Sequence, residues 1–261
     1  MSETQRIAPD PNSEIAHGRR LAGGDPETAW GWGTPAGRLR ARRRADLIVR
    51  GSRLAPGQRV LEIGCGTGMF TDMFAASGAQ ITAVDISEEL LERARARGIP
   101  NARFLARRFE DCEVEGPFDA VIGSSVLHHL DIEDALPRVF GLLAPGGRMA
   151  FAEPNYLNPQ VFLERKLRFI KPLFWYISPD ETAFVRGSFG TLLRRKGFTE
   201  IDIVPFDWLH PKTPARMIPM VLAVGRALEA TPGLREFSGS LLITACRPER
   251  DGVRAAHPTA R

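Results

Sequence analysis

The chain has 261 residues, of which 43% are hydrophobic and 25% charged, a composition typical of a globular protein with room for one large α/β domain. Its formal charge of +4 comes from the N-terminal segment, because residues 1–57 hold ten arginines against six acidic residues and the remainder balances. Arginine outnumbers lysine along the whole chain, so the charge gives little support to a nucleic-acid partner, and we expect none.

The expected elements follow one another in a regular order. Residues 1–26 are rich in proline, glycine and charge without periodicity, which predicts a mobile tail, and residues 27–57 are expected to form the helices of an N-terminal lid. From 58 to 247, short apolar runs alternate with helical patterns. Strands are predicted at 59–65, 80–86, 102–107, 118–125, 147–154, 200–205 and 240–247, and helices at 68–77, 88–97, 131–143 and 212–230.

This alternation predicts the fold class. Strands that read as continuous apolar runs between helices are typical of a parallel sheet covered on both faces. We therefore expect an α/β fold with a Rossmann-like, seven-stranded, mostly parallel sheet that the two late strands complete. A change of pattern after residue 154 predicts a helical cap insertion at 155–187, and residues 248–261 are expected to form a second mobile tail.

Membrane-spanning and disulfide-bonded classes are not expected. The longest apolar run, at 217–225, is far too short to cross a bilayer, and the first residues contain no apolar targeting segment. We therefore expect a cytoplasmic protein without stable membrane insertion. Cys65, Cys112 and Cys246 are odd in number and widely spaced, which argues against both a disulfide framework and a zinc site.

The most informative segment is "VLEIGCGTGMFT", in which an apolar strand ends in a glycine-rich turn over 64–68 and a helix begins at once. Glycines at such a turn allow the backbone to turn tightly and to approach a ligand closely. A dinucleotide site would need a third glycine where Met69 stands. The turn therefore disfavours a nicotinamide or flavin cofactor.

The pattern E-x-G-x-G-x-G after a first strand resembles the glycine motif of the class I S-adenosylmethionine-dependent methyltransferases. Three further segments resemble later motifs of that family, in the same order and at the same spacing: "AVDIS" at 83–87, "FDAVIGSSVLHHL" at 118–130 and "LLAPGGRMAFAEPN" at 142–155. The resemblance covers about residues 58–155 and implies S-adenosylmethionine as the cofactor.

The resemblance also implies roles for individual residues. The loop amides and Ser124 would bind the amino-acid part of the cofactor, Asp85 would accept hydrogen bonds from the ribose hydroxyls, and Ile86 would pack on the adenine. Glu62 would either brace the loop or reach the methionine ammonium group. The expected cofactor-binding residues are Glu62, Gly64, Cys65, Gly66, Gly68, Asp85, Ile86, Arg108, Phe109, Ser124 and Ser125.

The end of the third strand departs from the family pattern. Many members have an acidic residue there that accepts from the adenine amino group, followed by an apolar residue. This chain has Arg108 before Phe109. Either Glu110 or Asp111 substitutes for that acid, or the adenine edge is held in another way.

Aromatic residues indicate where a second substrate would bind. Every tryptophan and tyrosine lies outside the five core strands, in the N-terminal segment, the insertion or the loop after the sixth strand. Such side chains suit an apolar pocket with a few polar groups, although they would also suit a cap that packs on itself. The expected lid and substrate residues are Trp30, Trp32, Tyr156, Tyr176 and Trp208.

One arginine is expected to join this lid. On a helix over 36–50, Ala41, Ala45 and Ile48 share a face with Val49 and form a buried stripe. Most arginines of this segment, namely Arg40, Arg42, Arg43, Arg44 and Arg50, are expected on the solvated side. Arg38 lies one turn before Ala41 and is predicted to face the cofactor carboxylate or the acceptor.

Three histidines are candidate general bases. His128 and His129 follow the fourth strand, just before Asp131, which is a predicted helix N-cap. Neighbouring residues in one regular element cannot both face inward, so at most one is expected to act as a base, and a structural role for the pair stays open. His210, on a late loop, is an independent candidate.

The sequence thus predicts methyl transfer from S-adenosylmethionine to a small-molecule acceptor, with a hydroxyl of a metabolite or natural-product intermediate as the first choice. Nitrogen or carbon methylation of a quinone-like or lipid acceptor is the alternative, and a regulatory protein that binds the cofactor without transfer is the alternative of another class. The tetrapeptide N/D-P-P-Y/F of many amine methyltransferases is missing after the fourth strand, and the acidic spacing of a catechol-type metal site is not evident, so no metal is expected. A homodimer is left open.

Overall fold

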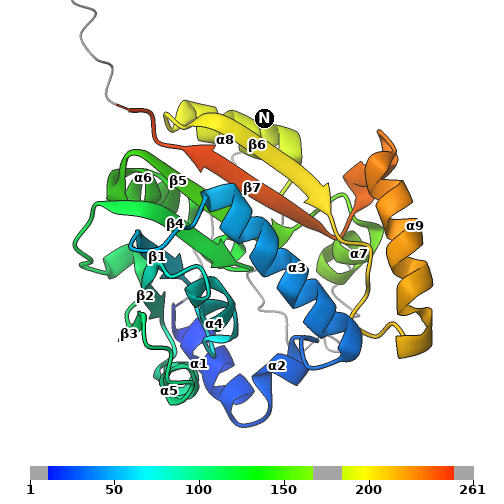
Figure 1. Cartoon of the computed structure of the whole chain (residues 1–261), viewed down its shortest axis with the longest axis horizontal. Helices are drawn as coiled ribbons and strands as arrows, with labels where there is room; N and C mark the ends of the chain where they lie inside the picture. Colours follow the sequence, from blue (N-terminus) through cyan, green and yellow to red (C-terminus); the bar gives the residue numbers. More distant parts are fainter. Residues whose placement is uncertain (1–10, 167–183, 250–261) are drawn as a thin grey trace, which may run out of the picture.

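The computed structural model describes residues 11–166 and 184–249, which form a seven-stranded sheet with helices on both faces (Figure 1). The strands are β1 (Arg59–Ile63), β2 (Gln80–Asp85), β3 (Ala102–Ala106), β4 (Phe118–Ser124), β5 (Leu143–Pro154), β6 (Thr199–Phe206) and β7 (Ser240–Cys246). The α-helices are α1 (Pro11–Ala22), α2 (Pro26–Ala29), α3 (Pro35–Ser52), α4 (Met69–Ala75), α5 (Glu88–Ala96), α6 (Ile132–Leu142), α7 (Pro159–Lys166), α8 (Arg186–Arg195) and α9 (Ile218–Ala230).

The topology of the sheet fixes where a ligand can bind. The strand order is β3-β2-β1-β4-β5-β7-β6, with β1 to β5 paired in parallel and β7 antiparallel to both β5 and β6. The direction of strand addition reverses between β1 and β4. Open α/β sheets bind their ligands beyond the carboxyl ends of the strands at such a reversal. The predicted seven-stranded, mostly parallel sheet is confirmed.

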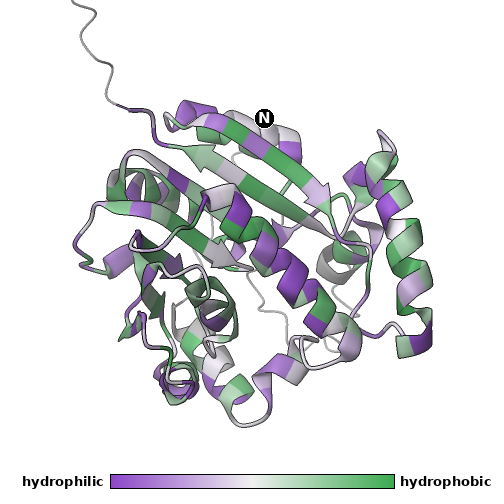
Figure 2. Cartoon of the chain, in the orientation of Figure 1, coloured by the Kyte–Doolittle hydropathy of each residue, from purple (hydrophilic) through white to green (hydrophobic). Residues whose placement is uncertain are grey.

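Two apolar layers cover the sheet because alternate residues of each strand point to opposite faces. On one face, Val60 and Ile122 pack with Ile48 of α3 and Phe74 of α4. On the other face the strands pack against α6 and α8. Purple and green residues alternate along α3, while the central strands are mostly green (Figure 2).

The N-terminal region differs from the prediction of a mobile tail over 1–26. Residues 11–22 form helix α1, which packs on α5. Leu21 is buried, and the Arg19 guanidinium lies 2.8 Å from the Glu89 carboxylate. Polar composition without visible periodicity was therefore misleading here, because α1 is stabilised by contacts with a distant helix. Residues 1–10 lie outside the described residues.

Two further predictions fall partly outside the described residues. Helix α7 and the beginning of α8 are helical within the expected cap at 155–187, whereas residues 167–183 are not described. The predicted tail at 248–261 is described only as far as residue 249.

Phe151, fully buried on β5, tests the packing of the sheet against α6 and α8. Because Phe151→Ala removes a ring and leaves a cavity, we expect it to lower the free energy of unfolding by about 3–5 kcal/mol, measured by equilibrium urea denaturation. Val204→Ala on β6, where the side chain is 39% exposed, should cost less than about 1 kcal/mol. Equal losses in the two variants would contradict this account of the core.

Candidate active site

The glycine turn lies directly after β1 and before α4, at the point where strand order reverses. Gly64, Gly66 and Gly68 all have positive φ, at 69°, 53° and 73°. A Cβ added to Gly64 would lie 2.4 Å from a methyl group of Val126, and one added to Gly66 would lie 3.3 Å from the Trp30 ring. A side chain at Gly64 or Gly66 is excluded by conformation and by these close neighbours, so the backbone at both positions faces the cavity directly.

Asp85, at the end of β2, is held against this turn. Its carboxylate accepts hydrogen bonds from the backbone N–H groups of Gly66 (2.7 Å) and Ser87 (2.9 Å). Burial raises the pKa of Asp85 even though these hydrogen bonds oppose the shift. The carboxylate therefore stands at a fixed position beside the turn.

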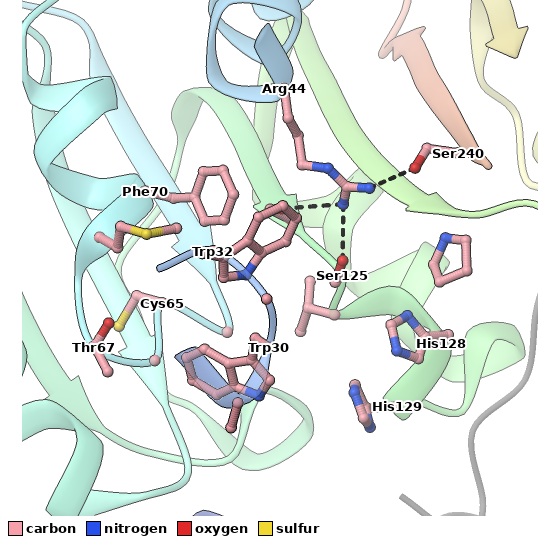
Figure 3. A pocket seen from close by; sticks show the side chains of 18 of the residues that line it. Trp30, Trp32, Arg44, Cys65, Thr67, Phe70, Ser125, His128, His129 and Ser240 are labelled. Carbon is pink, nitrogen blue, oxygen red and sulfur yellow. Dashed lines mark hydrogen bonds between the residues drawn. The ribbon is translucent and has the colours of Figure 1, made fainter. Parts of the chain in front are cut away.

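A cavity of about 800 Å³ opens beyond the carboxyl ends of the strands. Its walls come from the lid of α1 to α3, the glycine turn, the ends of β2, β4 and β5, the start of α7 and the loop at 207–212. In Figure 3 the two lid tryptophans lie between the turn residues and the pair of histidines. The predicted site residues that line it are Trp30, Trp32, Gly64, Cys65, Gly66, Asp85, Ile86, Arg108, Phe109, Ser124, Ser125, His128, His129, Trp208 and His210.

Glu62 and Gly68, expected at the cofactor, do not line the cavity and lie behind the turn. Glu62 is buried, and its Oε2 has no hydrogen-bond partner among the described residues. Burial raises the pKa of Glu62 to about 8. Gly68 is the N-cap residue of α4.

The structure distinguishes between the two acids that the sequence left open for the adenine edge. Arg108 pairs with Glu110 at 3.2 Å and with Asp111 at 3.4 Å, so its charge is directed to these two acids. Glu110 lines the cavity, whereas Asp111 does not and is 72% exposed. Of the two acids that the sequence left open, Glu110 is the one in reach of a ligand in the cavity.

Of the arginines of α3, Arg42 and Arg50 are exposed as expected, but the expectations for Arg38, Arg40 and Arg44 were wrong. Arg40, expected in solvent, is 16% exposed, pairs with Asp207 at 2.7 Å and lines the cavity. Arg38 is exposed, donates to the backbone oxygen of Gly33 and does not line the cavity. Arg44, expected in solvent, is 3% exposed and lines the cavity. The predicted stripe of Ala41, Ala45 and Ile48 is buried, but Arg44 stands one turn from both Ala41 and Ile48 and shares their side of the helix.

The Arg44 guanidinium is surrounded by neutral partners. It donates to Ser125 Oγ (2.8 Å), the Ala152 oxygen (2.9 Å) and Ser240 Oγ (2.7 Å), with Ser124 Oγ farther away at 3.3 Å (Figure 3). Its buried Nε has no partner among the described residues. Burial lowers the pKa of Arg44 to about 10, so the side chain stays charged at neutral pH. A buried cation in this setting favours an anion beside it.

His128 is oriented by a carboxylate that the sequence reasoning missed. Its Nδ1 lies 2.6 Å from Oε2 of Glu153, and the other Glu153 oxygen accepts from the backbone amides of Val126 (3.0 Å) and Leu127 (2.9 Å). Burial acts to raise the pKa of Glu153, but the charge of His128 and these hydrogen bonds outweigh it and lower the pKa. An acidic residue within the apolar run "MAFAEP" was the available signal.

The short segment around these histidines is fixed at both ends. Residues 127–129 form a 3₁₀ turn after β4, and α6 begins with Asp131 as its N-cap, accepting from Glu133 N at 3.0 Å, as predicted. The rings of His128 and His129 lie 4.2 Å apart between centroids, and both residues line the cavity. The expectation that only one of them could face inward was therefore wrong, because a 3₁₀ turn is not a regular strand or α-helix.

Of the other residues predicted for the acceptor, Trp208 and His210 line the cavity, Tyr156 does not, and Tyr176 is not described. Trp208 lines the cavity, and its buried Nε1 has no partner among the described residues. His210 is exposed at the rim, where its Nδ1 accepts from Lys212 N at 3.1 Å. Tyr156 does not line the cavity and packs edge-on against Phe162 instead. Tyr176 lies outside the described residues.

The lid is held to the turn by residues that sequence reasoning did not select. Glu27 of α2 accepts from Thr67 Oγ1 at 2.9 Å and pairs with Arg97, which also donates to the Thr67 oxygen at 2.7 Å. Arg97 follows α5, so three segments meet at this point. Within the described ranges, no cluster of three His, Cys, Asp or Glu residues that could hold a metal ion is found.

Comparisons with known proteins agree with this geometry. Residues 60–147 match a family model described as a methyltransferase domain. A ubiquinone biosynthesis O-methyltransferase from Xanthomonas oryzae pv. oryzae is 36% identical over 105 residues, covering 38% of this chain and 44% of the relative. A protein of the same name from Bordetella parapertussis is 33% identical over 112 residues, covering 41% and 46%. The chain spans less than half the length of these relatives.

Solved structures show the same fold over most of the chain. The N-methyltransferase NodS from Bradyrhizobium japonicum, in complex with S-adenosylhomocysteine, superposes with a TM-score of 0.59 at 19% identity, covering 91% of this chain and 100% of that one. The cyclase SpnF superposes with a TM-score of 0.65 at 19% identity, covering 94% and 98%. Likeness at such low identity establishes the fold alone.

The family model, the sheet topology and the glycine turn together define the class. This chain contains a class I S-adenosylmethionine-dependent methyltransferase domain. The matched residues 60–147 include the turn, Asp85 and His128, whereas the lid and the cap lie outside the match.

Burial of Glu62 makes the stability of the protein depend on pH, and this dependence can be measured. Its carboxyl ionises near 4.5 when unfolded and near 8 when folded, so the unfolded state loses its proton first and stability falls as the pH rises between these values. Glu62→Gln removes this contribution. The melting temperature of the variant relative to the parent protein should therefore rise steadily from about pH 4.5 to pH 8.

Asp111→Asn serves as the control for the change of a carboxyl to an amide, at a side chain that is 72% exposed. A constant difference between Glu62→Gln and the parent protein over this range would contradict the burial account of Glu62.

Proposed function

We propose that the chain transfers a methyl group from S-adenosylmethionine to a hydroxyl group of a small-molecule acceptor. The observation that carries this proposal is the pair formed by His128 and Glu153, which places an oriented imidazole on the same cavity as the glycine turn. A hydroxyl is a poor nucleophile until it loses its proton, so a positioned base is what such an acceptor requires.

The residues present fit the cofactor. The glycine turn lines the cavity with no side chain at Gly64 or Gly66 between its backbone and a ligand, and the Asp85 carboxylate stands beside it at the end of β2. We assign Asp85 to the ribose hydroxyls, Ile86 and Phe109 to the faces of the adenine, and Glu110 to its amino group. S-adenosylmethionine would supply an electrophilic methyl group at this place.

Arg44 supports the binding of the amino-acid end of the cofactor. It is a buried cation with neutral partners and one unpaired N–H, and it lies at the ends of β4 and β5. A carboxylate bound there would offset the cost of burying the guanidinium and would gain charge-assisted hydrogen bonds. We assign to Arg44 the role that the sequence suggested for Arg38.

We assign to His128 the role of general base. Because Glu153 accepts from Nδ1, the nitrogen that can receive a proton is Nε2, and the carboxylate would stabilise the imidazolium that forms. Alignment of acceptor and methyl group by the cavity would supply much of the remaining rate enhancement. His129 stays a second candidate for the same role.

The acceptor would occupy the part of the cavity between His128 and the loop at 207–212. The walls there are the Trp208 ring, whose indole N–H is available as a donor, and the first residues of α7. The size of about 800 Å³ leaves room for an acceptor beside the cofactor. Nitrogen and carbon acceptors remain possible in the same space, and the cytoplasmic location and the lack of a nucleic-acid partner stay predictions.

Release of S-adenosylhomocysteine during incubation with a panel of phenols, catechols, amines and quinols tests the proposal. Turnover of hydroxylated acceptors, with the methyl group on oxygen by mass spectrometry, would support it. Cofactor binding by calorimetry without turnover of any acceptor would instead favour a protein that binds the cofactor without transferring the methyl group. A methyl group found on nitrogen or carbon would replace the hydroxyl of this proposal by an amine or a carbon acceptor.

Arg44→Gln tests the assignment of the cofactor carboxylate. Loss of the guanidinium charge should weaken S-adenosylhomocysteine binding by roughly tenfold to a hundredfold, measured by calorimetry, since a charge-assisted hydrogen bond contributes about 1.5–3 kcal/mol. Arg38→Gln on the same helix is the matched control, and its affinity should stay within about twofold. Equal effects of the two substitutions would contradict the assignment.

His128→Gln and Glu153→Gln test the base. We expect kcat to fall by roughly a hundredfold or more in His128→Gln, while affinity for S-adenosylhomocysteine changes little. Glu153→Gln should lower kcat less than His128→Gln does. It should also shift the pH dependence of kcat, because the carboxylate acts through the imidazole. His210→Gln, at the rim, should change kcat by less than about threefold. A larger loss in His210→Gln than in His128→Gln would move the base to the late loop.

A further inference from the structure

Exposed apolar side chains gather on one part of the molecule. Ten large hydrophobic residues are exposed among those described, and eight of them belong to the start of the cap, to α9 with the 3₁₀ helix η4 (Ala215–Met217) before it, and to the 3₁₀ helix η5 (Leu234–Phe237). We call these eight the apolar face. They are Leu157, Phe162, Leu163, Met217, Met220, Val224, Leu234 and Phe237.

The three segments of the apolar face are joined to one another. Asn158, just before α7, donates to the Phe237 oxygen at 2.8 Å, and Asn155 donates to the Glu236 oxygen at 2.8 Å. Helix η5 packs on α9. Figure 2 shows apolar residues along α9. The segments that carry these exposed side chains are therefore neighbours in the fold.

Most charges on this face are basic, although Glu164 follows Leu163 and Glu236 stands between Leu234 and Phe237 in the sequence. Residues 155–163 and 209–228 contain the cations Lys212, Arg216 and Arg226 and no aspartate or glutamate. The acids at the ends of this region are paired elsewhere, Glu229 with Arg43 of α3 at 2.5 Å and Glu236 with Arg186 of α8 at 2.8 Å. An apolar surface with basic residues beside it matches the interface of an anionic bilayer.

The same segments border the cavity. Residues 158–161 at the start of α7 line it, as do residues 207–212, which lead into α9. The mouth of the cavity and the apolar face thus share two segments of chain. A surface held by the face would lie next to the acceptor end of the cavity.

A second copy of the chain fits this face less well. In a twofold interface the same patch meets itself, so its excess cations would be brought toward identical cations, while Glu229 and Glu236 are already paired with Arg43 and Arg186. An anionic lipid surface places phosphate groups against these cations instead.

We infer that the apolar face binds the surface of an anionic lipid bilayer and directs the mouth of the cavity toward it. Contact is peripheral, because no helix within the described ranges is long and apolar enough to span a membrane. Met220 and Val224, 56% and 53% exposed on α9, would enter the interfacial region, with the exposed Arg216, just before α9, near the headgroups. Resting on the proposed function, the acceptor class that follows is an amphiphile whose lipid chain stays in the bilayer.

Vesicle flotation with the full chain tests this inference. The parent protein should bind mixed phosphatidylcholine–phosphatidylglycerol vesicles, bind pure phosphatidylcholine vesicles more weakly, and lose binding as salt is added. The double variant Met220→Glu, Val224→Glu should bind the mixed vesicles roughly tenfold less. Val204→Glu on β6 is the matched control, with the same change of residue at an exposed strand position, and should bind like the parent protein.

Melting temperature and S-adenosylhomocysteine affinity, measured on each variant, separate the outcomes. Equal vesicle binding by the double variant and the parent protein would overturn the inference, as would a parent protein that binds no anionic vesicle. A parent dimer by light scattering that the double variant converts to a monomer would assign the face to a second copy and also overturn it. Absence of cofactor binding with vesicle binding intact would overturn the proposed function alone.

Discussion

The buried guanidinium of Arg44 is the interaction on which the arrangement of the site depends. It is carried by α3, outside the segment that matches the family model, yet its hydrogen bonds end on β5, on β7 and on the turn after β4. Desolvation of an arginine is costly, and this one has no acidic partner in direct contact among the described residues. The lid helix is therefore fixed to the sheet by a charge that these contacts do not neutralise, at the place where the cavity begins.

Two buried glutamates in the same site show how environment separates similar groups. Glu153 receives two backbone amides and an imidazole and is stabilised as a carboxylate, whereas Glu62 has an unpaired oxygen among the described residues and is stabilised as a neutral acid. The pKa values accordingly move in opposite directions. Burial acts in the same sense on both carboxyl groups, so the difference comes from the charge of His128 and the hydrogen bonds that Glu153 receives, against the nearby charge of Asp85 at Glu62.

Much of this molecule could be predicted from the sequence because it is encoded locally. Apolar runs, the glycine turn and the N-cap at Asp131 each depend on residues within a few positions, and the strands and the place of Asp85 followed from them. Contacts between distant segments could not be inferred from neighbouring residues. Arg44 meets Ser240 across 196 positions, and α1 is stabilised by α5, so neither the buried arginine nor the ordered N-terminal helix could be recognised from neighbouring residues.

The position of β7 has a consequence for how the chain is made. This strand is the last of the described sheet in the sequence, is buried along its whole length, and lies between β5 and β6. During synthesis from the N-terminus, β6 therefore emerges with no strand to pair with, and the edge of β5 stays open until residues 240–246 have left the ribosome. Exposed strand edges on a nascent chain are sites of misassembly. Completion of the sheet thus waits for residues 240–246, and a truncation within β7 would remove the only partner that β6 has in the described sheet.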